Sequence, residues 1–171
     1  MNPGRIVNPP KMDDRSLFRY TPEYKPIDLK PVLDWSHNNG FLGAVEMCNN
    51  NGACRKIPGG VMCPSYRVTK EEQHLTRGRA NTLRLALTGQ LGTEAFSSKD
   101  MAATMDLCVS CKGCRRECPT GVDMARMKIE VKHALVKRDG LSPRDRLAVS
   151  YTHLRAHETV LDLVCRLLLE K

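Results

Sequence analysis

The stretch Cys108-Val-Ser-Cys-Lys-Gly-Cys-Arg-Arg-Glu-Cys-Pro119 places four cysteines within 11 residues and ends on a Cys-Pro pair. Two-residue spacers let a short loop wrap around a metal cluster and direct three thiolates toward it from different sides. Structural zinc, the main alternative, is usually bound by two separated pairs of cysteines around a tetrahedral ion. The spacing therefore predicts a 4Fe-4S cluster, with four candidate ligands in this motif: Cys108, Cys111, Cys114 and Cys118.

A second group, Cys48-x5-Cys54-x8-Cys63-Pro64, follows the same pattern with Asn51 at the second cysteine position. In two-cluster proteins the cysteine before the proline binds the other cluster. A neutral carboxamide is a poor iron ligand beside thiolate, so a second cluster here would be 3Fe-4S or a cubane with a labile iron near Asn51. The alternative is that Cys48 and Cys54 are buried structural thiols beside one cluster. The crossing rule predicts two ligand sets: Cys63 with Cys108, Cys111 and Cys114, and Cys118 with Cys48 and Cys54.

Helical patterns fill the 44 residues between the two cysteine groups, and no strand alternation of useful length is present. This spacing favours an α-helical ferredoxin-type 4Fe-4S domain over 41–147, mainly α, rather than a compact ferredoxin built on short strands. Three helices are predicted. The first carries Ala80, Leu83 and Leu87 and ends at Gly89, and the second is capped by Ser97 and Asp100 and has Met101, Met105 and Cys108 on one face. The third begins at Thr120, with Asp123 three residues later, and ends at Gly140; its apolar stripe is Met124, Met127, Val131, Ala134 and Leu135.

The first 40 residues predict an extended connector, because six of the ten prolines lie in residues 1–31. No run of ~18 apolar residues suggests a membrane span, and no signal-peptide pattern opens the chain. Eight cysteines without export point to metal or redox chemistry rather than disulfides. We therefore expect a cytoplasmic protein, or one peripheral to the inner membrane if a quinone is the final acceptor.

The formal net charge is +8, and basic residues surround the cysteines. A cluster with four thiolates is net negative, so nearby cations should raise its reduction potential and favour an anionic docking partner. The alternative is solvated surface charge. Nucleic-acid binding is not expected, because aromatic residues for base stacking are not interleaved with the basic ones. The basic residues are Arg55, Lys56, Arg77, Arg79, Lys112, Arg115 and Arg116.

These motifs, with Met62-Cys-Pro-Ser-Tyr66 and Arg77-Gly-Arg-Ala80, resemble the iron–sulfur segment of FAD-linked dehydrogenases of the D-lactate/D-2-hydroxyglutarate type. Asn2-Pro-Gly-Arg-Ile6 is similar to the stretch that closes the flavin module of that family. The resemblance implies that a FAD-linked oxidase domain precedes residues 1–40 and that a cysteine-rich domain follows. The parent protein would then be an oxidoreductase, while this fragment alone has no catalytic residues and lacks the flavin site.

The last stretch, Val149–Lys171, resembles a translated adaptor from short-read sequencing libraries, with a gap where a variable index belongs. We therefore predict that residues 149–171 are a non-native tail and that Cys165 is not a ligand.

The resulting hypothesis is an electron-transfer segment that passes electrons from FAD through one or two clusters to an unknown acceptor. The alternative is a structural or nucleic-acid-binding module in which metal only staples the fold. Reversible reduction of the bound metal separates the two, because zinc has no redox chemistry.

Overall fold

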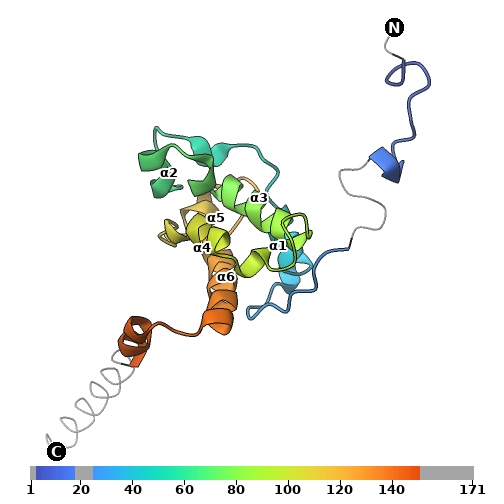
Figure 1. Ribbon diagram of the computed structural model, residues 1–171. Helices are drawn as coiled ribbons and strands as arrows, with labels where there is room; N and C mark the ends of the chain where they lie inside the picture. Colours follow the sequence, from blue (N-terminus) through green and yellow to red (C-terminus); the bar gives the residue numbers. More distant parts are fainter. Residues whose placement is uncertain (1–2, 18–24, 151–171) are drawn as a thin grey trace, which may run out of the picture.

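The computed structural model describes residues 3–17 and 25–150, and this part of the chain is mainly helical, as predicted (Figure 1). Its strand-like pairing is limited to an isolated bridge between Pro3 and Val7. None of its helices has the length and apolar character that a bilayer crossing requires. The α-helices are α1 Phe41–Glu46, α2 Pro64–Thr69, α3 Thr76–Leu87, α4 Lys99–Asp106, α5 Gly113–Glu117 and α6 Met124–Asp139, and residues 143–150 are also helical. The 3-10 helices are η1 Arg15–Leu17, η2 Ser36–Asn38, η3 Ala53–Arg55, η4 Glu72–His74 and η5 Ala95–Ser97.

Two predicted helix starts are wrong by a few residues. The N-cap of α4 is Ser98 rather than Ser97, because the Ser98 side chain accepts a hydrogen bond from the Met101 N–H. Helix α6 begins after Asp123, whose carboxylate accepts from the Arg126 N–H, and not at Thr120. Residues 118–121 instead form a turn, closed by a hydrogen bond from the Gly121 N–H to the Cys118 carbonyl. Cys108 likewise lies beyond the end of α4, not on its face.

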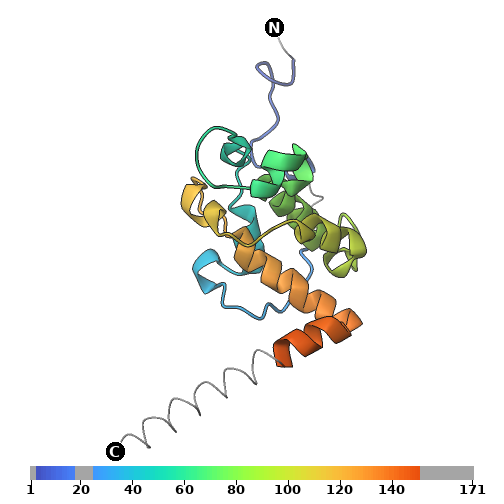
Figure 2. The same ribbon diagram turned by 90° about the vertical axis from the view of Figure 1, so that its left-hand side faces the viewer.

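The core forms where α3, α4 and α6 pack together. Figure 2 shows α6 running diagonally through the helical body, beside the other two. The predicted stripe of α6 is confirmed: Met124, Met127 and Val131 are buried, and Ala134 and Leu135 pack against the core. An aromatic cluster extends this core, with Phe41 edge-on to both Trp35 and Phe96.

The second half of the connector is fixed to this helical body, whereas residues 3–17 stand away from it (Figure 1). The Ile27 N–H donates to the Leu87 carbonyl at the end of α3. The buried carboxylate of Glu130 on α6 accepts three hydrogen bonds, from the Val32 and Leu33 N–H groups at 2.9 Å and from the Trp35 indole at 2.8 Å. This carboxylate replaces the water that the connector backbone would otherwise bind, and so anchors the connector next to the core.

Candidate iron–sulfur site

Four cysteines from the two separate motifs line one pocket that is partly open to solvent. Cys118, the last cysteine of the second motif, does not line this pocket. We call this site the four-cysteine pocket. The arrangement agrees with the crossing rule, although ligation of iron by these residues stays a prediction. The pocket cysteines are Cys63, Cys108, Cys111 and Cys114.

The loop between α4 and α5 wraps around the pocket through two residues in the left-handed region. Ser110 has φ 54° and Lys112 has φ 59°. Because the backbone turns at each of these two residues, Cys108, Cys111 and Cys114 face the pocket from different directions. At the start of α5, a Cβ on Gly113 would lie 3.0 Å from Val61 Cγ2. The glycine therefore allows the second motif to approach the segment that precedes Cys63.

Helix N-termini supply hydrogen bonds to two of the pocket sulfurs. Cys63 Sγ lies 3.1 Å from both the backbone nitrogen and the hydroxyl oxygen of Thr76, the first residue of α3. Cys114 Sγ accepts from the N–H groups of Met124 and Ala125, at the start of α6. Both helices thus direct the positive ends of their dipoles toward sulfur, which favours thiolate over thiol. Burial acts in the opposite direction and raises the pKa of both thiols, so a bound metal would be needed to hold them deprotonated.

The remaining cysteines, Cys48, Cys54 and Cys118, form what we call the three-cysteine group. Cys54 is buried on η3, and its sulfur accepts from the N–H of Arg77 in the first turn of α3. Burial raises the pKa of the Cys54 thiol, and negative charge on Cys63 and Cys48 would raise it further. Cys118 follows α5, which packs against η3. The first turn of α3 therefore contacts a cysteine of each set.

Cys118 has the most strongly hydrogen-bonded sulfur of this group. Burial alone would raise the pKa of its thiol, but hydrogen bonds from the Thr120 hydroxyl and from the N–H groups of Val122, Thr120 and Gly121 together lower it. The Thr120 hydroxyl oxygen lies 3.3 Å from Cys118 Sγ. The segment 120–122, where sequence analysis placed the start of a helix, thus surrounds a sulfur with donors.

Asn51, at the open position of the first motif, is exposed and engaged in the hydrogen bonds of its own loop. Its side-chain oxygen accepts from the Ala53 N–H at 2.8 Å, and its side-chain nitrogen donates to Asn49 at 2.5 Å. The neighbouring Asn50 bonds to Asn81 on α3. The carboxamide oxygen of Asn51 therefore has a local structural partner rather than a position free for iron.

Glu117 joins the two motifs, and sequence analysis did not identify it. Its carboxylate accepts from the N–H groups of Val61 at 2.6 Å and Met62 at 3.0 Å, directly before Cys63. These hydrogen bonds lower the pKa of the carboxyl group, so it is held as an anion. The feature of the sequence that could have pointed to Glu117 is that it is a single acidic residue among the basic residues of the second motif.

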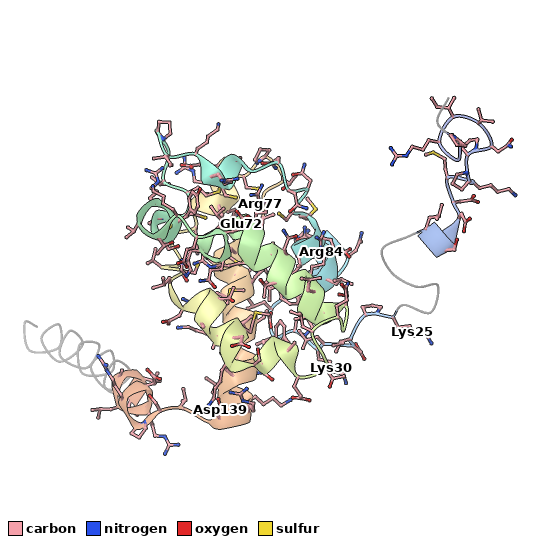
Figure 3. All side chains as sticks on the ribbon, turned by 45° about the horizontal axis from the view of Figure 1, so that its top comes forward. Lys25, Lys30, Glu72, Arg77, Arg84 and Asp139 are labelled. Carbon is pink, nitrogen blue, oxygen red and sulfur yellow. The ribbon has the colours of Figure 1, made fainter. Side chains whose placement is uncertain are left out.

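The basic residues near the cysteines divide into exposed and buried groups. Arg77 is ion-paired with Glu72 at 2.6 Å, and Figure 3 shows the two side chains side by side at the start of α3. Arg79 is buried and lines the four-cysteine pocket. Lys128, which sequence analysis did not consider, is also buried and donates to the Asp106 and Cys108 carbonyls at 3.2 and 2.5 Å. The exposed residues are Arg55, Lys56, Lys112, Arg115 and Arg116.

The donors of the four-cysteine pocket fit a cluster held by thiolates. Among the described residues, no three His, Cys, Asp or Glu side chains are placed to bind a single metal ion together. A cubane presents its thiolates at separate iron corners, so its ligand sulfurs stand further apart than the donors of a mononuclear ion. Four cysteines spread over one pocket, with N–H groups directed at their sulfurs, match this requirement.

Comparison with known proteins agrees with this chemistry. Residues 44–122 match the family described as a 4Fe-4S dicluster domain. The chain is 27% identical over 146 residues to the D-2-hydroxyglutarate dehydrogenase of Pseudomonas putida, an alignment covering 65% of this chain and 14% of that protein. Proteins of the same name from Haemophilus influenzae and Escherichia coli are 25% and 24% identical, covering 78% and 75% of this chain and 16% of each relative. No solved structure matches the chain.

The chain thus spans about a seventh of the length of these relatives and matches their iron–sulfur segment. The resemblance drawn from the cysteine motifs is confirmed at this level.

Proposed function

We propose that this chain is the electron-transfer segment of a flavin-dependent 2-hydroxy-acid dehydrogenase, accepting electrons from reduced FAD and passing them to a downstream acceptor. The observation that carries the proposal is the four-cysteine pocket, in which one cysteine of the first motif joins three of the second. Such crossing is typical of ferredoxin-type domains with two clusters. The relatives named D-2-hydroxyglutarate dehydrogenase support a hydroxy acid as the substrate of the parent enzyme.

The cysteines act as ligands and not as nucleophiles. Cys63, Cys108, Cys111 and Cys114 would hold a 4Fe-4S cluster, which supplies reversible one-electron chemistry when it is bound. Thr76 and the first turn of α6 hold the orientations of two of these sulfurs. Glu117 keeps the two motifs together, so that ligands from distant parts of the sequence meet at one site.

The three-cysteine group would hold a second cluster, in line with the dicluster family that matches residues 44–122. Cys48, Cys54 and Cys118 offer three thiolates, and the amide of Asn51 is already hydrogen-bonded within its loop. We therefore propose a 3Fe-4S cluster, or a cubane with one labile iron, at this position.

In the parent protein, residues 1–40 would connect a FAD-linked oxidase domain to the ferredoxin-type domain at 41–147, and a cysteine-rich domain would follow. The hydrogen bonds from the connector backbone to Glu130 support this arrangement, because they would hold the preceding domain close to the helical body. The described cysteines are all free thiols, in keeping with a cytoplasmic location.

Anaerobic reconstitution with iron and sulfide tests the proposal. The chain should bind ~4 irons at the four-cysteine pocket, become brown, and lose visible absorption reversibly on reduction. The isolated chain should not oxidise D-lactate or D-2-hydroxyglutarate, since its residues include no flavin site. Stoichiometric zinc without colour or reducibility would contradict the proposal and support the metal-stapled structural module.

A further inference from the structure

Arg79 is a charged side chain in the interior of the protein. Its residue is only 2% exposed, and its guanidinium donates to the Thr104 carbonyl at 3.0 Å, the His74 carbonyl at 2.8 Å and the Ser65 hydroxyl at 3.1 Å. All three acceptors are neutral. These hydrogen bonds give each guanidinium nitrogen one acceptor but leave the positive charge without a compensating anion.

No carboxylate of the described residues lies within ion-pair distance of Arg79. Other charged side chains in the same region do have partners that balance or bind them. Arg77, two residues earlier on α3, is paired with Glu72. Glu130, the buried acid of α6, receives three N–H donors. A buried ion without a partner costs several kcal/mol, so proteins retain one chiefly where an opposite charge arrives.

Arg79 also forms part of the wall of the four-cysteine pocket. Ser65, which accepts from the guanidinium at 3.1 Å, lines the same pocket two residues after Cys63. Lys128 is a second buried cation near the same loop: it donates to the backbone carbonyls of Asp106 and Cys108 and has no carboxylate within ion-pair distance among the described residues, but it does not line the pocket. The anion that would balance the charge of Arg79 is therefore one bound in the four-cysteine pocket.

We propose that the buried guanidinium of Arg79 is the fixed counter-charge of the cluster held by Cys63, Cys108, Cys111 and Cys114, and that it raises the reduction potential of this cluster. The inference rests on the proposed function. A cluster bound by four thiolates is net negative, and each added electron makes it more so. A positive charge buried beside the cluster stabilises the reduced form more than the oxidised form. Arg79 thus acts on the cluster through its charge and is not one of its ligands.

A redox titration of the reconstituted full chain, followed by electron paramagnetic resonance with dithionite as the one-electron donor, tests this role. Arg79→Gln keeps hydrogen-bond donors but removes the charge. Its cluster should be at least tenfold harder to reduce at a given potential, a shift of about 59 mV to more negative values for a one-electron couple. Arg84→Gln is the matched control, because that cation lies further along the same helix α3 and does not line the pocket. It should leave the potential of this cluster unchanged.

A second pair of variants covers the case in which Arg79→Gln does not fold. Ser65 contacts the guanidinium directly, so Ser65→Asp places a carboxylate beside Arg79, whereas Ser65→Asn adds a side chain of the same size without charge. The aspartate variant should have the more negative potential, or should take up less cluster than the asparagine variant.

The outcomes separate the inference from the proposed function. Failure of the wild-type chain to bind a reducible cluster contradicts the proposed function. A wild-type cluster whose potential is unmoved in Arg79→Gln overturns the inference alone. Equal behaviour of the two Ser65 variants, whether both load or both fail, also overturns it, because they differ only in charge.

Discussion

The two sets of cysteines differ in how the fold supports them. The four-cysteine pocket adjoins the packed core: α3 and α6 begin at two of its sulfurs, and the buried Arg79 forms part of its wall. The three-cysteine group is held by a short 3-10 helix and by loops, and the exposed Asn51 takes the place of the second cysteine in the sequence pattern of the first motif. A site whose ligands are fixed by core packing loses less conformational freedom on binding than one held by loops.

From this contrast we predict which of the two cysteine sets would hold its cluster more firmly. Iron in the four-cysteine pocket should resist chelators, whereas iron in the three-cysteine group should be lost first. The first turn of α3 contacts both sets, through Thr76 at Cys63 and Arg77 at Cys54. A substitution in the first turn of α3 should weaken iron binding at both cysteine sets. A substitution that touches one set should weaken iron binding at that set only.

The largest effect is expected from Cys111→Ser. Cys111 is the exposed cysteine of the four-cysteine pocket, so its replacement removes a ligand without opening a cavity in the core. The visible absorption of this cluster should disappear, and iron analysis should show a loss of ~4 irons per chain. Cys165→Ser, in the predicted non-native tail outside the described residues, is the matched control. Equal iron content in both variants would contradict the assignment of Cys111.

Gly78→Ala should weaken both sites together. A Cβ at this position would lie 2.0 Å from the Glu72 carbonyl oxygen and 2.8 Å from its carbon, and this backbone of η4 cannot move aside easily. The first turn of α3 would shift, at a cost of about 1–3 kcal/mol in the free energy of unfolding. Urea denaturation of the apoprotein measures the cost, and iron analysis measures the loss from both sites. Loss of iron from one site alone would show that α3 does not support both.

Asn51→Cys should strengthen the three-cysteine group alone. It adds the thiolate that the first motif lacks, so iron at this site should be lost more slowly to a chelator. Asn49→Cys, in the same exposed loop but outside the motif pattern, is the matched control and should not slow the loss. An effect on the cluster of the four-cysteine pocket would contradict the separation of the two sites.

Deletion of residues 149–171 should have the smallest effect. The side chains of residues 141–150 are all exposed, and both cysteine sets lie before this segment. Cluster content and the thermal midpoint of unfolding should stay unchanged. A loss of ~2–5 kcal/mol, the cost of removing a core side chain, would show that the tail belongs to the fold.

The sequence predicted the helical class and the core stripe of α6, because helical period is a local signal, whereas the pairing of the two motifs as ligand sets stays a prediction. It misplaced the start of α6, because the turn at 118–121 is shaped by hydrogen bonds around the Cys118 sulfur rather than by helix propensity. The roles of Glu117 and Lys128 depend on contacts with residues 55 and 20 positions away, which no local pattern shows. Arg79 appeared in sequence as one basic residue among several, and only packing sets it apart.

The most direct test of the central claim is a crystal structure of the anaerobically reconstituted chain, with iron located by its anomalous scattering. We predict that the Cys63 sulfur binds the same cluster as Cys108, Cys111 and Cys114, while Cys118 lies outside that ligand set. A cluster closed by Cys118 within its own motif, with Cys63 unbound, would contradict the account.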